Sequence, residues 1–345
     1  MLAKTSHRPF VNPVTLAAIE RAAATVYQFG RVTPLLPSMF LGHCVTHGNV
    51  FLKLENMQLT GSFKFRGAFN KIAQLTAAEK RRGIITASAG NHAQGVALTA
   101  KLLGIQATVV MPIHAPKAKQ EATTGYGAKV ILAGETFDEC RLYMEAMAAH
   151  RALVIVDPYD DADVIAGQGS IGLELLEQLP QVDTIIVPIG GGGLIAGVAT
   201  AVKALRPAVH IIGVQSQNVH GMAASYVAGR LSTYGAGPTL ADGTAVATPG
   251  AITYPICARL VDEIVLVDET AIATAMKDLM ARTKIMVEGA GALAVAAIES
   301  GAIDAKWLKN RNVVAIVSGG NVDLSRVAHN LNQFLAMEAS VQPVR

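Results

Sequence analysis

Short runs of β-branched and other apolar residues alternate with segments of helical periodicity along most of the chain, and this alternation limits the fold more than any other feature. Phe65, Phe69 and Ile72 typify the helical segments, because their spacing places apolar side chains on one face of a helix. Strand–helix alternation predicts an α/β fold of open, mostly parallel, twisted sheets flanked by helices. The runs expected to form strands are residues 50–54, 84–88, 107–111, 130–133, 153–156, 184–189, 210–214, 263–267 and 313–317.

Three more helices are expected. An apolar segment at 14–29 predicts an N-terminal helix that serves either the core or a contact between subunits. Thr136, followed by Glu139 three residues later, forms a capping-box pattern at the start of a helix over 137–150. The last helix should begin near Leu324.

The composition agrees with such a fold and excludes several functions. The chain has 345 residues, enough for two domains, and 51% are hydrophobic while 16% are charged. This composition is expected where helices cover both faces of buried parallel strands. The net charge is only +3 and Lys and Arg do not cluster, so neither nucleic acid nor a membrane surface is an expected partner.

The cysteines and the apolar runs indicate a cytoplasmic protein. Cys44, Cys140 and Cys257 are widely spaced and form no CxxC pair, so neither a disulfide framework nor a zinc site is predicted. The N-terminus lacks the apolar stretch of a signal peptide, and the longest apolar run, 184–202, is interrupted by Pro188 and four glycines.

The glycine tetrad Gly190, Gly191, Gly192 and Gly193 stands between a predicted strand and an apolar helix, 194–204. Bare backbone N–H groups at a helix N-terminus bind anions, although a simple tight turn would also account for the glycines. The tetrad with Ala196 fits the G-x-G-x-x-G/A dinucleotide pattern, but the next strand leads to Gln215 rather than to a carboxylate. A phosphate monoester therefore fits better than NAD or a nucleoside triphosphate.

Lys64 is the candidate nucleophile. Ser62 is expected to be an N-cap, which places Lys64 in the first turn of a helix. The helix dipole and partial burial would lower the pKa of Lys64 and favour the neutral amine that forms a Schiff base. An exposed lysine is the alternative, and Lys53, Lys71 and Lys80 are expected to be solvated.

Four motifs taken together resemble the signature set of fold-type II pyridoxal-phosphate (PLP) enzymes, and the likeness covers roughly residues 14–330. Within that group the chain is similar to the serine/threonine dehydratases, and most of all to the short catabolic threonine dehydratases. The motifs are Ser62-Phe63-Lys64-x-Arg66-Gly67-Ala68, Ser88-Ala89-Gly90-Asn91-His92, the tetrad followed by Leu194-x-Ala196-Gly197, and Ser318-Gly319-Gly320-Asn321.

The resemblance implies a domain organisation and a role for each matching residue. A large PLP-binding domain would comprise residues 1–52 and 154–345, with a small domain, 53–153, inserted in it. Lys64 would carry the cofactor and then remove the Cα proton of the substrate. The other implied roles are Phe63 beneath the cofactor, Asn91 on its 3′-oxygen, Gly190 to Gly193 with Leu194 around its phosphate, Ser318 at its ring nitrogen, Ser88, Ala89, Gly90, Asn91 and His92 around the substrate carboxylate, and Glu288 and Gly243 as further candidates near the cofactor.

The implied reaction is α,β-elimination. L-Threonine would give 2-oxobutanoate and ammonia, and L-serine would give pyruvate. Because a Ser318 hydroxyl does not force protonation of the ring nitrogen, the cofactor is a mild electron sink that favours prompt loss of a β-leaving group. The family usually forms homodimers or homotetramers.

Serine racemase is the main alternative, and it needs a second acid/base group on the face opposite the lysine. Similar racemases carry a serine where this chain has Ala89, and they bind a divalent metal through carboxylates where it has Gln215 and Gly221. A monovalent cation near Gln215, held by carbonyl oxygens, stays open. A β-replacement synthase and a catalytically silent PLP-binding protein stay open as well.

Overall fold

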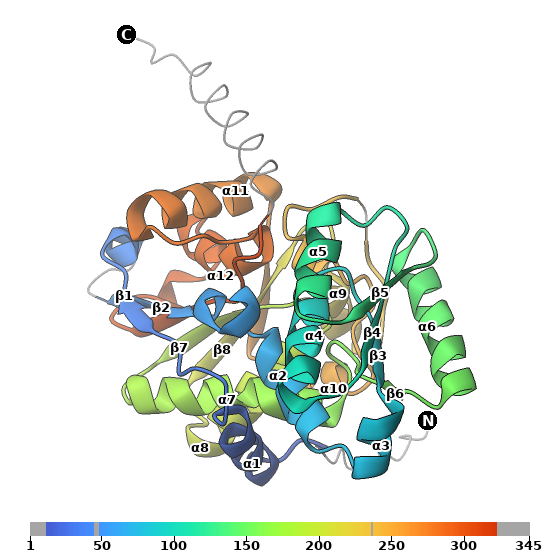
Figure 1. Cartoon of the computed structure of the whole chain (residues 1–345). Coiled ribbons are helices and arrows are strands. Elements are labelled where there is room, and N and C mark those ends of the chain that lie inside the picture. Colours follow the sequence, from blue (N-terminus) through green and yellow to red (C-terminus); the bar gives the residue numbers. More distant parts are fainter. Residues whose placement is uncertain (1–11, 45–47, 236, 323–345) are drawn as a thin grey trace, which may run out of the picture.

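The computed structural model describes residues 12–44, 48–235 and 237–322, which form two sheets that lie side by side and are covered by helices (Figure 1). The large sheet has the strand order β1-β2-β10-β7-β8-β9, and the small sheet has the order β5-β4-β3-β6. Adjacent strands are parallel except β1 and β2. The strands are β1 (Leu35–Pro37), β2 (Asn49–Leu54), β3 (Ile84–Ala87), β4 (Ala107–Met111), β5 (Lys129–Leu132), β6 (Val154–Ile155), β7 (Thr184–Pro188), β8 (His210–Ser216), β9 (Glu263–Val267) and β10 (Asn312–Val317).

Helices fill most of the connections between these strands. The α-helices are α1 (Leu16–Val26), α2 (Lys64–Ala73), α3 (Ala77–Arg82), α4 (Asn91–Leu103), α5 (Lys117–Gly125), α6 (Phe137–Arg151), α7 (Ala162–Gln178), α8 (Gly193–Leu205), α9 (Gly221–Ala228), α10 (Thr253–Leu260), α11 (Glu269–Asp278) and α12 (Gly289–Glu299). Shorter helical turns are η1 (Phe40–Cys44), η2 (Glu55–Met57), η3 (Leu59–Gly61), η4 (Asp242–Thr244), η5 (Leu279–Thr283) and η6 (Ala305–Trp307).

The α/β fold with parallel sheets is confirmed, and each predicted strand is present with its ends within two residues of the expected ones. Strand β1 was not expected. It is three residues long, lies antiparallel at the edge of the sheet and ends in Pro37, so it carries little of the apolar pattern that marks the other strands.

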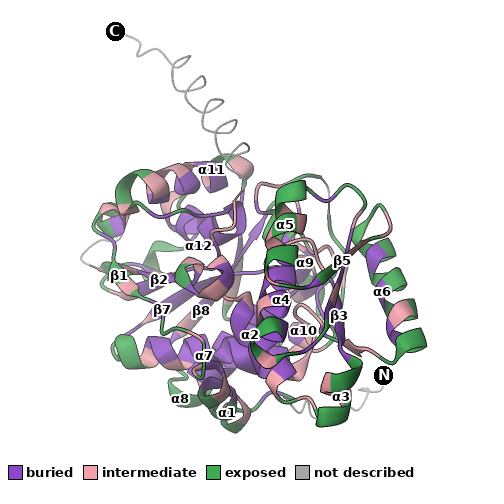
Figure 2. Ribbon diagram, viewed as in Figure 1, coloured by how far each residue is buried: buried purple, intermediate pink, exposed green. Residues whose placement is uncertain are grey.

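The central strands of the large sheet, β10, β7 and β8, are buried on both faces, as their purple colour in Figure 2 shows. Side chains of β10 alternate between two separate hydrophobic clusters: Val313 and Ala315 pack with α11 and α12, whereas Val314 and Ile316 pack with α1, α7, α8 and α10. This two-residue period is the geometry of a strand between two helical layers. The small sheet is arranged likewise, with α2 and α4 on one face and α6 on the other.

Helix α2 lies where the two helical layers meet, because it packs both against α7 of the large sheet and against α4 of the small sheet. The small sheet spans Ile84 to Ile155, and β2 of the large sheet runs to Leu54. The division of the chain into domains at 52/53 and 153/154 stays a prediction.

Several local expectations were wrong. Helix α2 begins at Lys64 with Phe63 as its N-cap, so Ser62 does not cap it; Ser62 instead forms a β-bridge with Gly319. Thr136 does cap α6, but the Glu139 carboxylate accepts a hydrogen bond from Glu135 N (2.7 Å) rather than from Thr136, so the capping box is incomplete. Lys53 is fully buried in an ion-pair network rather than solvated.

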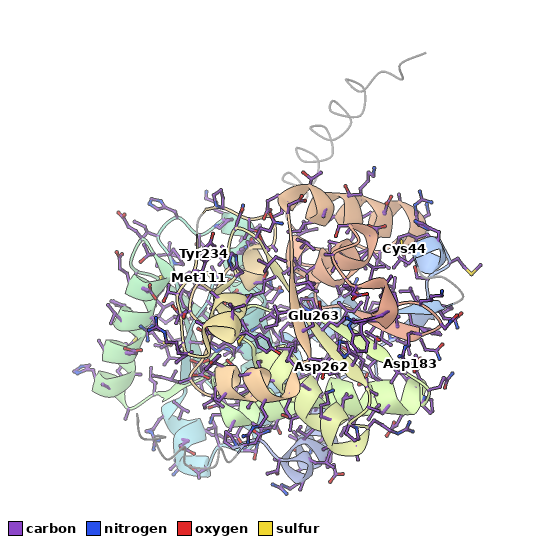
Figure 3. All side chains as sticks on the ribbon, turned by 180° about the vertical axis from the view of Figure 1, so that it is seen from behind. Cys44, Met111, Asp183, Tyr234, Asp262 and Glu263 are labelled. Atoms are coloured by element: carbon purple, nitrogen blue, oxygen red, sulfur yellow. The ribbon has the colours of Figure 1, made fainter. Side chains whose placement is uncertain are left out.

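Other expectations concern the ends of the chain and the cysteines. Helix α1 belongs to the core, since Ile19, Ala22 and Val26 are buried. The helix expected near Leu324 lies outside the described residues. Cys44 is half-buried at the edge of the molecule (Figure 3), and the described part of the chain has no helix both long and apolar enough to cross a membrane.

Charged side chains at the amino ends of the strands in the large sheet form hydrogen bonds and ion pairs that connect neighbouring strands. Asp262 precedes β9 and its carboxylate accepts a hydrogen bond from Ile211 N (2.7 Å) and pairs with Lys203 (2.7 Å). Asp183 precedes β7 and accepts from Asn312 N (2.8 Å); both aspartates are labelled in Figure 3. The residues expected to carry chemistry lie at the opposite, carboxyl edge.

Candidate active site

Segments far apart in the sequence are joined by backbone hydrogen bonds at the carboxyl edge of the large sheet. Phe63 N donates to the Ser318 carbonyl (3.1 Å), and Gly320 N donates to the Gly61 carbonyl (2.9 Å). The start of α2 is therefore fastened to the segment that follows β10. This contact brings Lys64 and Ser318 into one site, as the strand-end rule for parallel sheets predicts.

Lys64 is half-buried in the first turn of α2, and its Nζ donates a hydrogen bond to the Pro158 carbonyl (2.7 Å). Burial lowers the pKa of Lys64 to about 8, although the carboxylates of Asp157 and Glu288 act in the opposite direction. The Phe63 ring lies beside the amine, with Nζ 5.1 Å from the ring centre. Lys64 is thus a lysine with a substantial neutral fraction near neutral pH.

Ser318 is buried directly after β10, and its Oγ donates to the Ala290 carbonyl at 3.3 Å. Ser62, which forms a β-bridge with the next residue, Gly319, is also buried, and its hydroxyl finds no partner among the described residues. Gly319 lies against the carboxylate of Glu288, because a Cβ at Gly319 would lie 2.2 Å from Glu288 Oε1.

The asparagine loop leads from β3 into α4. Gly90 is the N-cap of α4, and because glycine has no side chain the first turn is uncapped. The N–H of Gly90 itself donates to Ser88 Oγ (3.2 Å). The N–H groups of such a turn lack partners within the helix and suit a carboxylate. Ala89 in this loop is half-buried and has no group that can carry a proton.

His92 faces the protein interior. Its Nε2 lies 2.9 Å from the Val156 carbonyl, which requires the hydrogen to be on Nε2. Burial lowers the pKa of His92 to about 3, and the ammonium of Lys64 contributes in the same direction. The imidazole is therefore neutral, so only the backbone of His92 can serve an anionic group.

Buried Glu288 and half-buried Asn91 form a hydrogen-bonded pair. Asn91 Nδ2 donates to Glu288 Oε1 at 2.6 Å, although the two residues are 197 positions apart. Burial raises the pKa of Glu288 to about 8, while the hydrogen bond from Asn91 acts to lower it. Gly243 lies beside this pair, since a Cβ there would be 3.8 Å from Glu288 Oε1. Of the two further candidates, Glu288 therefore contacts Asn91 directly, and Gly243 lies near the Glu288 carboxylate.

The glycine tetrad forms the turn between β7 and α8. Gly192 is the N-cap of α8 with φ +101°, a left-handed conformation that favours glycine. A Cβ at Gly191 would lie 2.4 Å from the Tyr159 ring, and one at Gly192 would lie 2.6 Å from Met222 Cε. The turn thus admits only glycine, and the first N–H groups of α8, including that of Leu194, are left for an external acceptor.

The loop after β6 also belongs to the site, although the sequence patterns did not single it out. Pro158 holds Lys64, and Tyr159 packs against Gly191 and Gly193 of the tetrad. Asp160 fixes the loop by accepting hydrogen bonds from the N–H groups at the start of α10, including Ile252 N (2.8 Å). A signal was present, since an Asp- and Pro-rich loop follows a predicted strand and should lie at the same edge of the sheet.

A buried ion-pair network anchors the helix that carries Lys64. Arg66 binds Glu55 in bidentate fashion (Nε–Oε2 2.8 Å, Nη2–Oε1 2.9 Å) and pairs with Glu174 of α7 (2.8 Å). Lys53 pairs with the other oxygen of Glu174. This network connects β2, α2 and α7, so it fixes the position of α2 relative to the large sheet.

Gln215 is engaged within the protein: its Oε1 accepts from Ala223 N (2.8 Å) and its Nε2 donates to the Ile189 carbonyl (3.4 Å). Across residues 12–44, 48–235 and 237–322, no three His, Cys, Asp or Glu side chains are grouped so that they could hold a metal ion. A monovalent cation at this place stays a prediction.

The sequence and the fold of this chain are similar to those of known proteins. Residues 26–319 match the family of pyridoxal-phosphate dependent enzymes. Over 323 residues the chain is 62% identical to L-threonine dehydratase catabolic TdcB of Staphylococcus aureus (strain USA300), covering 92% of this chain and 93% of that protein. Among solved structures, serine racemase of maize is 36% identical with a TM-score of 0.88, covering 95% of this chain and 99% of that chain. Threonine deaminase isoform 2 of Solanum lycopersicum is 36% identical with a TM-score of 0.85, covering 96% and 93%.

Proposed function

This chain belongs to the family of pyridoxal-phosphate-dependent enzymes, and we propose that it converts L-threonine to 2-oxobutanoate and ammonia, and L-serine to pyruvate and ammonia. The observation that carries the proposal is the 62% identity to a catabolic threonine dehydratase over nearly the whole length of both chains. The fold is that of the type II PLP enzymes, as in the related threonine deaminase.

The residues of the site fit the cofactor. The turn at Gly192 admits no side chain and ends at the start of α8, which suits a phosphate, and Lys64 offers an amine with a lowered pKa for the aldehyde. Asn91 would donate to the 3′-oxygen, and Ser318 would face the ring nitrogen. When bound, the cofactor withdraws electrons from the substrate Cα, which weakens the Cα–H bond and favours loss of the β-hydroxyl.

Lys64 would remove the Cα proton. Its hydrogen bond to Pro158 holds Nζ in place, and burial keeps its pKa near the range in which a general base works at neutral pH. The Phe63 ring lies beside the amine. The N–H groups at the start of α4 would bind the substrate carboxylate and so orient the Cα–H bond.

Serine racemization is the second candidate, favoured by the similarity to the racemase of maize. A racemase must deliver a proton to the face opposite Lys64. Ala89 stands in the loop where the resemblance implies a serine for that purpose, and a methyl group cannot carry a proton. Elimination therefore accounts better for the residues present than inversion does.

We also propose an oligomeric state, a location and a division into domains. We propose a homodimer or homotetramer that acts in the cytoplasm. The chain would be divided into a large domain of residues 1–52 and 154–345 and a small domain of residues 53–153.

The test is an initial-rate assay of the purified PLP-loaded enzyme with L-Thr, L-Ser, D-Ser and D-Thr, which measures 2-oxo acid and inversion of configuration. We expect 2-oxobutanoate from L-threonine, and a loss of about a thousandfold or more in Lys64→Ala together with loss of the visible cofactor band. Lys101→Ala, on the exposed face of α4, is the matched control and should retain activity. D-Serine formed faster than pyruvate would overturn the proposal.

A further inference from the structure

Asn91 uses both ends of its amide within the protein. Its Oδ1 accepts a hydrogen bond from Asn321 Nδ2 (2.8 Å), and its Nδ2 donates one hydrogen to Glu288 Oε1 (2.6 Å). An amide that is turned over by 180° would exchange the donor for the acceptor at both contacts. The direction of the Asn91 amide therefore decides whether an N–H or a carbonyl faces its surroundings.

A backbone carbonyl fixes that direction. Asn321 Nδ2 also donates to the Thr60 carbonyl (2.6 Å), and a main-chain carbonyl can only accept. Asn321 must therefore present its NH₂ group, with one hydrogen for Thr60 and the other for Asn91. It follows that Asn91 must present Oδ1 to Asn321, which leaves Nδ2, with its second hydrogen, on the opposite side.

The anchor for this chain of bonds is itself held firmly. Thr60 has φ +63° and Gly61 has φ +71°, and Gly61 binds Gly320 N through its carbonyl. A Cβ at Gly61 would lie 2.6 Å from Asn321 Oδ1, so the glycine makes room for the Asn321 side chain. The loop before Lys64 and the segment after Ser318 thus place Asn321 between Thr60 and Asn91.

We infer that Asn321 is a positioning residue that fixes the Asn91 amide so that an N–H group, and not the carbonyl, is presented to the 3′-oxygen of the cofactor. The inference rests on the proposed function, because it assumes that PLP occupies this site. It predicts that the electronic state of the bound cofactor depends on Asn321, whose side chain contacts Asn91 and Thr60.

Asn321→Asp tests the inference most sharply. The ionised carboxylate of this variant offers only acceptors, so Asn91 must turn its NH₂ toward it and present its carbonyl to the 3′-oxygen. A carbonyl there favours a protonated 3′-oxygen, so the visible absorption of the bound PLP should shift to shorter wavelength. The ratio of the two absorption bands should change about tenfold to a hundredfold, as expected when a buried hydrogen bond is left unmade, and kcat should fall with it.

The pH dependence separates positioning from a merely structural role. Protonation of the introduced carboxylate restores one donor, so the spectrum and kcat of Asn321→Asp should move back toward those of the wild type as pH falls. Asn321→Ala imposes neither direction, so its change should be smaller and independent of pH. Glu288 also titrates here, under the influence of Asp242, Lys119 and Lys64, but it is common to both variants and to the wild type.

Asn56→Asp is the matched control. Asn56 lies next to the segment that carries Asn321, because a Cβ at Gly320 would lie 3.2 Å from the Asn56 Cβ. Its Nδ2 donates to the Met286 carbonyl (2.9 Å), and this hydrogen bond does not involve Asn91. Its spectrum should be that of the wild type. If Asn321→Asp keeps the wild-type spectrum at every pH, or if Asn56→Asp shifts equally, the inference is overturned. If Asn321→Asp does not fold, a mixed spectrum in Asn321→Ala supports the inference and a wild-type spectrum there refutes it. A wild-type enzyme with no visible band overturns the proposed function itself.

Discussion

The chain encloses two sets of ionisable side chains near the start of α2, one around Arg66 and one around Lys64, and it treats them in opposite ways. In the network of Arg66, Glu55 and Glu174, each charge faces a charge of the other sign at 2.8–2.9 Å. In the site, Lys64 donates to a backbone carbonyl and Glu288 accepts from an amide, so neither meets an opposite charge at hydrogen-bond distance.

The pKa shifts follow this difference. Burial alone would lower the pKa of Arg66 and raise that of Glu174, but the opposite charges outweigh it: the pKa of Arg66 is raised and that of Glu174 lowered. In the site burial prevails, and it moves the pKa values of Lys64 and Glu288 to about 8. Lys53 is intermediate, since burial lowers its pKa although Glu55 and Glu174 oppose the shift. Paired charges fix the fold here, and unpaired ones are left able to exchange protons.

The largest expected effect comes from breaking the paired set. Arg66→Met keeps much of the side-chain volume but leaves Glu55 buried without its ion-pair partner and Glu174 paired with Lys53 alone, which should cost about 3–5 kcal/mol of stability. Urea unfolding of the apo protein at pH 7.5 measures it. Arg141→Met, which removes an exposed i,i+4 pair with Glu145 on α6, should change stability by no more than about 0.5 kcal/mol. A similar small change in Arg66→Met would contradict the comparison.

Glu288→Gln should have the opposite sign, because it removes an unpaired charge. The folded-state pKa of Glu288, about 8, lies above its ordinary value of 4.5, so the unfolded chain releases this proton first as pH rises. The wild type therefore loses stability between pH 5 and 8. A glutamine still accepts from Asn91 and does not titrate, so the variant should gain on the order of 2 kcal/mol relative to the wild type at pH 8.

Urea unfolding of both apo proteins at pH 5 and pH 8 gives the required difference. Glu121→Gln, at an exposed position of α5, is the control and should show the same pH dependence as the wild type. An unchanged gap between Glu288→Gln and the wild type at the two pH values would mean that Glu288 stays ionised in the fold.

Much of the architecture was predictable because it depends on local patterns. Strands β4 and β9 have the bounds expected from their apolar runs, and the strand-end rule placed Lys64 and Ser318 at one edge of the sheet. The helix dipole argument also led to a lowered pKa for Lys64, although burial is its leading cause.

The errors share a physical origin, which is that the deciding partner is distant in the sequence. Lys53 is buried because Glu174, 121 positions away, pairs with it. Ser62 looks like an N-cap by local rules, but the segment after β10 takes it into a β-bridge with Gly319. The contact of Asn91 with Glu288 likewise spans the chain. Periodicity and capping rules contain no information on such pairs.

The smallest effect concerns the proposed reaction of Lys64 with the cofactor and its rate. Only a neutral amine attacks an aldehyde. With a pKa of about 8, roughly one-tenth of Lys64 is neutral at pH 7, whereas less than about 0.1% of an ordinary lysine is neutral at that pH. The rate of holoenzyme formation from apo protein and PLP should therefore rise about tenfold per pH unit below pH 8 and level off above it. Stopped-flow absorbance of the cofactor measures this, at pH values above the second ionisation of its phosphate, about 6.

Asp157→Asn sharpens this last comparison. Asp157 is the leading opposing charge near Lys64, so its removal should lower the pKa of Lys64 further and move the midpoint of the rate profile to lower pH. The asparagine keeps an Oδ1 that accepts from Tyr159 N and Asp160 N, so the loop should stay in place. Asp138→Asn, on the exposed start of α6, should leave the midpoint unchanged. A wild-type midpoint near 10.5, the ordinary pKa of a lysine, would show that Lys64 is not shielded from water. The distinction between the two buried sets would then fail at Lys64, the residue proposed to carry the cofactor.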